Sequence, residues 1–199
     1  MVMPYSPAAN AKSVRSLAVA GVLLAVFSGG CSQTSQQPGT GATAAALNAK
    51  GVAAKDPKAA REWFQKAIAA DSYYGPAYNN LGIVLLNEGE YFEAAKAFDQ
   101  AIRNMPNNPE PRVNLGLVYE DADQLEKARD QYQQALTVAP ESIDALQALT
   151  RVQVRLDRVD DRTVEAFRQI ALRGTDAQWQ SWAKSMLIRF AGSSDATQP

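Results

Sequence analysis

The 199-residue chain contains no histidine and a single cysteine, Cys31. These absences exclude a histidine general base, a Ser-His-Asp triad, a metal cluster of histidine and cysteine, and an internal disulfide bond. Catalysis by carboxylates, for example at Glu120 and Asp121, or by a Ser/Lys pair remains open. Adjacent helical residues point about 100 degrees apart, however, and do not converge on one reacting atom. The sequence therefore predicts a protein that is not an enzyme and needs no metal or cofactor.

Acidic residues are absent before Asp56, and the apolar run at 17–27 is only eleven residues long. A helix of that length is too short to cross the roughly 30 Å hydrocarbon layer of a membrane. Two basic residues, Lys12 and Arg15, precede the run, and Ser-Gly-Gly-Cys at 28–31 follows it. A basic N-terminal region, an apolar central region and small residues at the cleavage site are typical of a secretion signal. Residues 1–30 are therefore predicted to be a signal peptide.

The position of Cys31 makes this leader resemble a bacterial lipoprotein signal, although Ser28 stands where that family usually has leucine. The resemblance implies that Cys31 becomes the lipidated first residue, which would anchor the protein without a spanning helix. An ordinary cleaved signal and a retained membrane anchor are the alternatives. Ser32 resembles the residue that sends such lipoproteins to the outer membrane, so the expected location is the bacterial cell envelope, facing the periplasm. The uncharged Ser, Gln, Thr, Gly and Pro residues up to position 41 predict a flexible tether.

One pattern is written twice between residues 75 and 142, and every position of the first copy recurs in the second at one constant offset. Each copy has apolar residues at helical spacing on both sides of a short polar turn, and each ends in proline. The first copy carries Tyr78, Leu81, Gly82, Leu85, Ala94, Phe98, Ala101 and Pro106, and the second carries Arg112, Leu115, Gly116, Tyr119, Ala128, Tyr132, Ala135 and Pro140. Glycine is expected to face alanine where the paired helices cross. A single hairpin cannot bury its apolar face, so neighbouring hairpins should stack.

These positions resemble the tetratricopeptide repeat (TPR) family, with departures at Leu85 and Arg112. The resemblance implies an all-α fold, a tandem helix-turn-helix solenoid closed by a C-terminal capping helix. The expected divisions are a degenerate repeat at 42–74, full repeats at 75–108 and 109–142, a degenerate pair at 143–173, a capping helix at 174–190 and a disordered tail at 191–199. In the degenerate pair, a turn longer by four residues would place Ala166 and Ile170 in the small and large core positions. Thr175 begins a predicted capping box for the last helix.

In this family the first helix of each pair lines a concave groove that binds protein or extended peptide. The resemblance places the following predicted partner-binding residues there: Asn79, Asn80, Ile83, Asn87, Asn114, Leu117, Glu120, Asp121, Gln147, Arg151 and Arg155. Two alternatives stay open. Asn80 and Asn114 could hydrogen-bond within the array, and Arg151 and Arg155 could pair with Asp144, Glu120 or Asp121. No lysine falls at the inner positions of the central repeats, which disfavours a lysine clamp for acidic tails.

Charge and aromatic patterns limit the other kinds of partner. Loss of Lys12 and Arg15 with the leader would leave 18 basic and 21 acidic residues, and arginines 151–173 are interleaved with acids, which argues against nucleic acid. Trp179 and Trp182 fall at helical spacing with other apolar residues and favour a core over a docking patch. The sequence thus predicts a membrane-tethered TPR adaptor that helps assemble an envelope complex. The alternative is a structural protein that self-associates, for example as a homodimer, through its convex face or last helix.

Overall fold

The computed structural model describes residues 40–190, and this stretch consists of helices and short turns without a strand. The predicted signal peptide, Cys31, most of the tether and the tail lie outside the described residues. In chain order the helices are α2 (Thr40–Ala53), α3 (Pro57–Ala70), α4 (Gly75–Asn87), α5 (Tyr91–Asn104), α6 (Glu110–Asp121), α7 (Leu125–Val138), α8 (Ile143–Arg155), α9 (Asp161–Arg173) and α10 (Ala177–Phe190).

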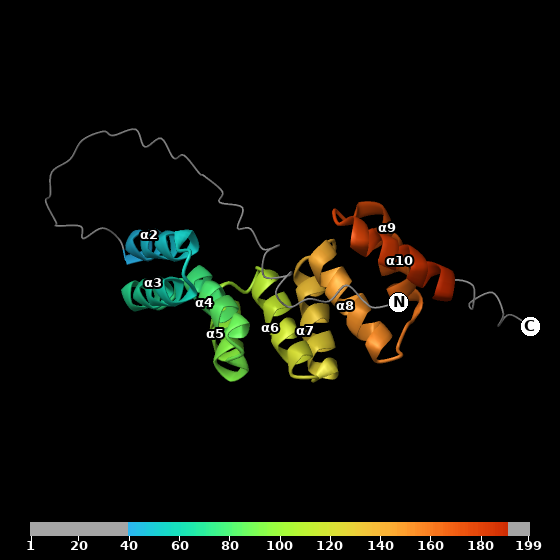
Figure 1. Ribbon diagram of the computed structural model, residues 1–199, viewed down its shortest axis with the longest axis horizontal. Coiled ribbons are helices and arrows are strands. Elements are labelled where there is room, and N and C mark those ends of the chain that lie inside the picture. The colour runs from blue at the N-terminus through green and yellow to red at the C-terminus, as the bar shows by residue number, and fades with distance from the viewer. Residues whose placement is uncertain (1–39, 191–199) are drawn as a thin grey trace, which may run out of the picture.

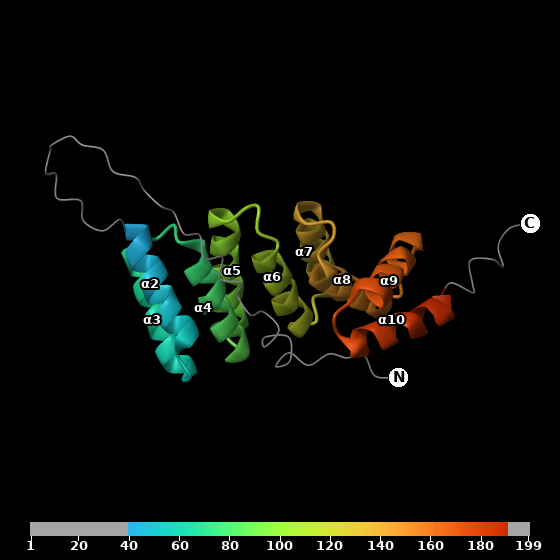
Figure 2. The same ribbon diagram turned by 90° about the horizontal axis from the view of Figure 1, so that it is seen from above.

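The helices pair as four hairpins, α2 with α3, α4 with α5, α6 with α7 and α8 with α9, which follow one another along the long axis of the molecule (Figures 1 and 2). Each second helix also packs on the first helix of the next hairpin, so the core is continuous along the array. Consecutive first helices, α2, α4, α6 and α8, contact one another as well, which gathers them on one side. This arrangement is the all-α tandem helical-repeat solenoid that the constant offset between the sequence copies predicts.

The turn inside each of the last three hairpins repeats the same backbone geometry. Gly89, Asp123 and Asp157, which occupy equivalent positions in successive repeats, have φ values of 78°, 55° and 54°. In each case the next amide donates to the carbonyl five residues before it, as Glu90 N does to Leu85 O at 2.9 Å. A single residue in the left-handed (αL) backbone conformation thus ends each first helix, a conformation that glycine adopts freely and that aspartate tolerates. The repeat period therefore specifies how the first helix of each of these hairpins ends.

Glycine lies where the two helices of a hairpin come closest. A Cβ built on Gly82 would lie 2.6 Å from the ring of Phe98, and one on Gly116 would lie 2.3 Å from the ring of Tyr132. Both rings are fully buried and cannot retreat toward solvent. The sequence predicted glycine opposite alanine, but the structure shows glycine opposite an aromatic ring. The missing side chain makes room for that ring.

The fourth hairpin departs from the period through its turn. Residues 156–160 separate α8 from α9, whereas residues 122–124 separate α6 from α7, so the turn is two residues longer and the predicted extension by four is wrong. Asp160 sets the start of α9 by accepting hydrogen bonds from Thr163 N at 2.8 Å and Thr163 Oγ1 at 2.6 Å. Thr163 and Phe167 join the expected Ala166 and Ile170 in the interior.

Helix α10 packs against α9 and covers the end of the last hairpin. Trp182, Ala183 and Met186 are buried in one cluster with Phe167 and Ile170, and the Trp182 ring meets the Phe167 ring edge to face at 5.5 Å between centroids. The predicted core role of the tryptophan stripe is confirmed. The cap residue differs from the prediction, because Asp176, not Thr175, accepts from the first amides of α10.

Candidate functional site

The eleven described residues predicted to bind a partner all lie on first helices, but they divide into two groups by burial. Asn79, Asn114, Glu120 and Arg151 are buried, with no more than 4% of each residue exposed. Their side chains contact neighbouring helices instead of solvent. The others are half-buried or exposed: Asn80, Ile83, Asn87, Leu117, Asp121, Gln147 and Arg155.

The asparagines connect consecutive first helices. Asn114 Nδ2 donates to Asn79 Oδ1 at 3.0 Å, and Asn79 Nδ2 donates to Glu110 Oε1 at 3.1 Å, which joins α4 to α6. Asn80 Nδ2 donates to Asn48 Oδ1 at 2.9 Å, which joins α2 to α4. Buried amides require such partners, because an unpaired one costs about 1–3 kcal/mol. The alternative of hydrogen bonding within the array is therefore what the structure shows for Asn80 and Asn114.

A buried ionic cluster joins α6 to α8. The Glu120 carboxylate accepts from Arg151 Nε at 2.8 Å and Arg151 Nη2 at 2.6 Å, and from Arg155 Nη1 at 3.0 Å. The Tyr132 hydroxyl adds a fourth hydrogen bond at 3.0 Å from α7. None of the Glu120 side chain and only 2% of that of Arg151 is exposed. The cluster therefore holds the third and fourth hairpins together.

The surroundings of this cluster set its protonation. Burial raises the pKa of the Tyr132 hydroxyl well above its usual value, and the negative charge of Glu120 raises it further. Burial acts to lower the pKa of Arg151, but its hydrogen bonds and charge interaction with Glu120 raise it overall. The tyrosine is therefore neutral and the arginine charged at neutral pH. Such a fully paired cluster offers neither a free base nor a free nucleophile for catalysis.

A mixed surface remains on the first helices beside these buried contacts, and Arg155 belongs to both the surface and the Glu120 cluster. Ile83 and Leu117, one period apart, are half-buried and pack against the core below them. Asn87, Asp121 and Arg155, also one period apart, form a polar row at the ends of α4, α6 and α8. Burial raises the pKa of Asp121, while the charges of Arg151 and Arg155 partly oppose this rise. We refer to Ile83, Leu117 and the three residues of the polar row as the first-helix face.

The sequence did not single out two features of the structure. Glu110 is half-buried, and burial raises its pKa, while its hydrogen bonds from Asn79 and Asn108 act the other way. The second feature is an open pocket between α5 and α6 that includes the exposed Phe92. Aligning the repeats position by position would have revealed the pocket, because charged residues at the equivalent positions are replaced there by small or aromatic ones.

Residues 40–190 lack two further kinds of site. No group of three or more acidic, histidine or cysteine side chains is placed to hold a metal ion in this stretch. Within the same range, every helix is too short or too polar to cross a bilayer.

Comparison with known proteins finds a match to the central repeats. Residues 73–141 match the tetratricopeptide repeat family. No curated protein matches the sequence significantly.

Solved structures share the fold. The first TPR of Spaghetti (RPAP3), bound to the HSP90 peptide SRMEEVD, is 18% identical, with a TM-score of 0.55 over 59% of this chain and 95% of that one. MamA is 23% identical, with a TM-score of 0.58 over 71% and 81% of the two chains. The TPR domain of Arabidopsis OM64 is 20% identical, with a TM-score of 0.56 over 59% and 99%. The described chain is thus an all-α tandem helical-repeat solenoid, and its central hairpins match the tetratricopeptide repeat family.

Proposed function

We propose that this protein is a non-catalytic adaptor that binds an extended segment of a partner protein along its first-helix face. The observation that carries the proposal is the division of the first helices into side chains that connect the hairpins and side chains that do not. The buried polar residues connect the hairpins, while Ile83, Leu117, Asn87 and Asp121 take part in none of those connections. An apolar pair beside a row of polar groups suits a peptide with apolar side chains and a backbone that needs hydrogen bonds.

The fold favours binding without much rearrangement. The asparagine contacts and the Glu120 cluster fix the spacing of α4, α6 and α8, so the surface exists before the partner arrives. A preformed surface lowers the entropic cost of association. One similar structure, the first TPR of Spaghetti, is bound to a peptide, which supports the same class of ligand. Binding of this kind to a small surface is expected to be transient.

We further propose that the adaptor acts in the bacterial cell envelope, attached through a lipid on Cys31, and helps assemble a complex there. The support is the leader at 1–30 and the position of Cys31 directly after two glycines. Mass spectrometry of the membrane fraction tests this proposal. We expect an acylated N-terminal Cys31, and a Cys31→Ser variant should leave the membrane fraction. An unmodified Cys31 in the mature chain would refute the lipid anchor.

Site-specific photo-crosslinking tests the binding face. A photoreactive residue at Asn87 or Leu117 should capture a partner in living cells, whereas the same residue at Gln133 or Gln134 on α7 should not. A second test is the pair Asn87→Arg/Asp121→Asn, which changes the charge of the row without placing a cation beside Arg151 and Arg155, with Gln133→Arg/Gln134→Arg as the control. We expect the first pair to remove the crosslink from Leu117 and the control to keep it. Equal crosslinking from both faces would contradict the proposal.

A further inference from the structure

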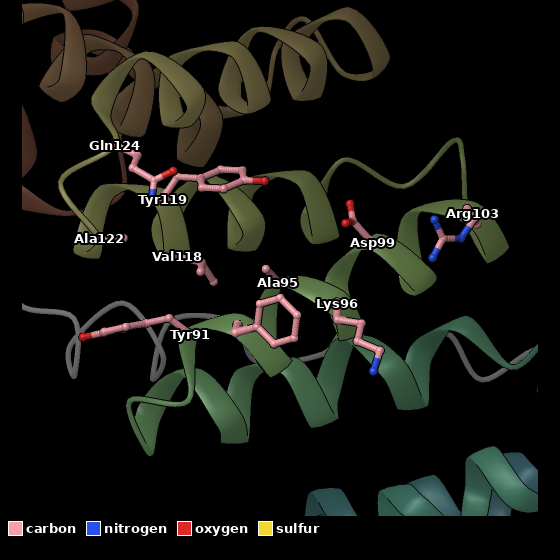
Figure 3. Close-up of a pocket in the computed structure, with 10 residues that line it drawn as sticks. Tyr91, Ala95, Lys96, Asp99, Arg103, Val118, Tyr119, Ala122 and Gln124 are labelled. Carbon is pink, nitrogen blue, oxygen red and sulfur yellow. The ribbon is translucent and has the colours of Figure 1, made fainter.

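An open pocket of about 530 Å³ lies between α5 and the end of α6. Figure 3 shows that α5 supplies one side, with Tyr91, Ala95, Lys96, Asp99 and Arg103, and that α6 and its turn supply the other, with Val118, Tyr119, Ala122 and Gln124. Its lining is mostly apolar. The volume falls within the range of pockets that hold small ligands or single large side chains. The pocket lies between a second helix and the first helix of the next hairpin, and none of its lining residues belongs to the first-helix face.

The same place one repeat earlier is occupied by an ionic bridge. Arg61 on α3 donates to Glu88 Oε2 at 2.6 Å and to Glu90 at 2.8 Å and 3.1 Å. These bonds connect α3 to the turn between α4 and α5. A step of one repeat along the chain replaces Arg61 by Ala95, Glu88 by Ala122 and Glu90 by Gln124. All three members of the bridge are therefore absent where the pocket lies. The pocket is the space that this bridge fills elsewhere.

The position equivalent to Ala95 in the next repeat carries arginine again. Arg129 on α7 pairs with Asp130 at 2.7 Å, and only 23% of its side chain is exposed. A long side chain therefore covers the surface at this position both before and after the pocket. Solenoid stacking does not require alanine here, because the neighbouring hairpins stack with arginine in its place.

Exposed aromatic surface accompanies the missing bridge. Phe92 is 78% exposed, and it is the second residue of α5. The second residues of α3, α7 and α9 are Lys58, Glu126 and Arg162. An exposed phenylalanine costs solubility and adds nothing to the core, whereas apolar surface beside a pocket marks an interaction site. Tyr91, also exposed, extends the same surface.

The charges around the pocket limit the choice of occupant. Arg103 hydrogen-bonds the Gln100 amide oxygen and forms no ion pair within residues 40–190. Lys96 makes only a long contact of 3.7 Å with Glu93, with 70% of its side chain exposed. Asp99 is the one acidic residue in the lining. The two turn positions that are glutamate one repeat earlier, 122 and 124, are uncharged here. The lining itself thus has two cations against one acid, which favours a partner with negative charge.

We propose that this pocket is a second docking site, which takes a large apolar side chain from a partner segment bearing carboxylates beside it. The apolar side chain lies against Ala95, Val118 and Tyr119, with Phe92 closing over it. The carboxylates meet Lys96 and Arg103. The site works independently of the first-helix face, so the array can hold two segments at once.

The test uses two synthetic amphipathic helical peptides with the same leucine stripe, one with glutamate and one with lysine on the polar face. Their affinities are measured by fluorescence anisotropy on the folded protein. Amide chemical shifts locate the binding site. We expect the glutamate peptide to bind with shifts at α5 and residues 118–124, and the lysine peptide to bind more weakly. Equal affinity of the two peptides, or shifts elsewhere, would overturn the proposal.

The second part of the test uses variants that place at the pocket the residues found at the equivalent positions of neighbouring repeats. Ala95→Arg/Ala122→Glu/Gln124→Glu rebuilds the bridge of Arg61, Glu88 and Glu90, so it should fold at least as stably as the parent while filling the pocket. We expect it to weaken the glutamate peptide about ten- to a hundredfold, the loss for one large apolar side chain left unburied. Phe92→Glu, which copies Glu126, should also weaken binding. The matched control is Leu172→Arg, at an 82% exposed leucine on α9.

Light scattering distinguishes a partner from a second copy of the chain. We expect a monomer whose mass does not change with Ala95→Arg. A dimer that this substitution dissociates would mean that the pocket binds another copy, and would overturn the partner proposal. Unchanged peptide affinity in the rebuilt-bridge variant, with its circular dichroism spectrum intact, would likewise refute it.

Discussion

Substitution of Glu120 tests whether the buried ionic cluster holds the third and fourth hairpins together. Glu120→Ala leaves the Arg151 guanidinium, 2% exposed, without its carboxylate. Arg155 is 32% exposed and can regain water, so the loss falls mainly on Arg151. Removing one partner of a buried ion pair costs about 3–5 kcal/mol. We expect a loss of stability in this range for Glu120→Ala.

A double-mutant cycle separates the cost of the orphaned charge from the net value of the pair. At an effective dielectric of about 20, unit charges about 4 Å apart attract by about 4 kcal/mol, while burying each ion costs several kcal/mol. The summed burial cost of the two ions is therefore at least as large as their attraction. Glu120→Leu/Arg151→Met, which removes both charges, should therefore be less destabilising than Glu120→Ala alone. Glu120→Gln should fall between them, because its amide oxygen still accepts one hydrogen bond.

Urea unfolding provides the measurement. Far-UV circular dichroism follows all hairpins, and tryptophan fluorescence follows the two ends, since Trp63 lies on α3 and Trp179 and Trp182 lie on α10. Two probes are needed because repeat arrays can unfold in parts. We expect Glu120→Ala to shift the α10 signal more than the α3 signal in single-tryptophan versions. A loss below about 1 kcal/mol, or strictly additive single and double variants, would refute the reasoning.

Three further substitutions test other parts of the array. Gly116→Ala should cost about 1–3 kcal/mol in urea unfolding, because the new methyl group meets the buried Tyr132 ring; a neutral effect would contradict the close helix crossing. Glu110→Gln should keep the bond from Asn79 and raise the melting temperature at pH 7. Burial raises the folded-state pKa of Glu110, so the wild-type protein loses stability as pH rises. The stability that Glu110→Gln gains over the wild type should therefore vanish below about pH 4, where the carboxyl of the unfolded chain is protonated. Trp182→Ala should cost about 3–5 kcal/mol and melt α10 first, so Trp179 fluorescence should change before the circular dichroism signal; retained stability would contradict its core role.

The repeated features of the fold were predictable because they recur at the same position of each repeat. The starts of α3, α5 and α7 at Pro57, Tyr91 and Leu125 keep one spacing. The start of α9 does not keep this spacing, because α9 begins directly after the Asp160 cap and not one period after Leu125. The sequence pattern does not show which of the two signals sets the start. A pattern of apolar residues also could not reveal that glycine faces a ring, because that depends on the rotamers of Phe98 and Tyr132.

The candidate site was harder to predict than the fold. Family resemblance places a residue on the first helix of a repeat but does not say whether it faces solvent or the next repeat. Asn114 and Arg151 face the preceding repeat because a partner for each lies there, at Asn79 and Glu120. Such pairings join residues of two different repeats and are not visible in either repeat alone. The polar row of Asn87, Asp121 and Arg155 stays a prediction as a binding surface.

The Glu120 cluster also bears on how this array could have grown. Tandem duplication of residues 109–142 would place the copies of Leu117 and Asp121 where Arg151 and Arg155 now meet Glu120, because these positions are one period apart. The first Glu120 would then be sealed beside a leucine and a second acid, with no cation in reach. Gene duplication, the usual route by which repeat proteins lengthen, is thus blocked at this junction unless compensating arginines arise with it.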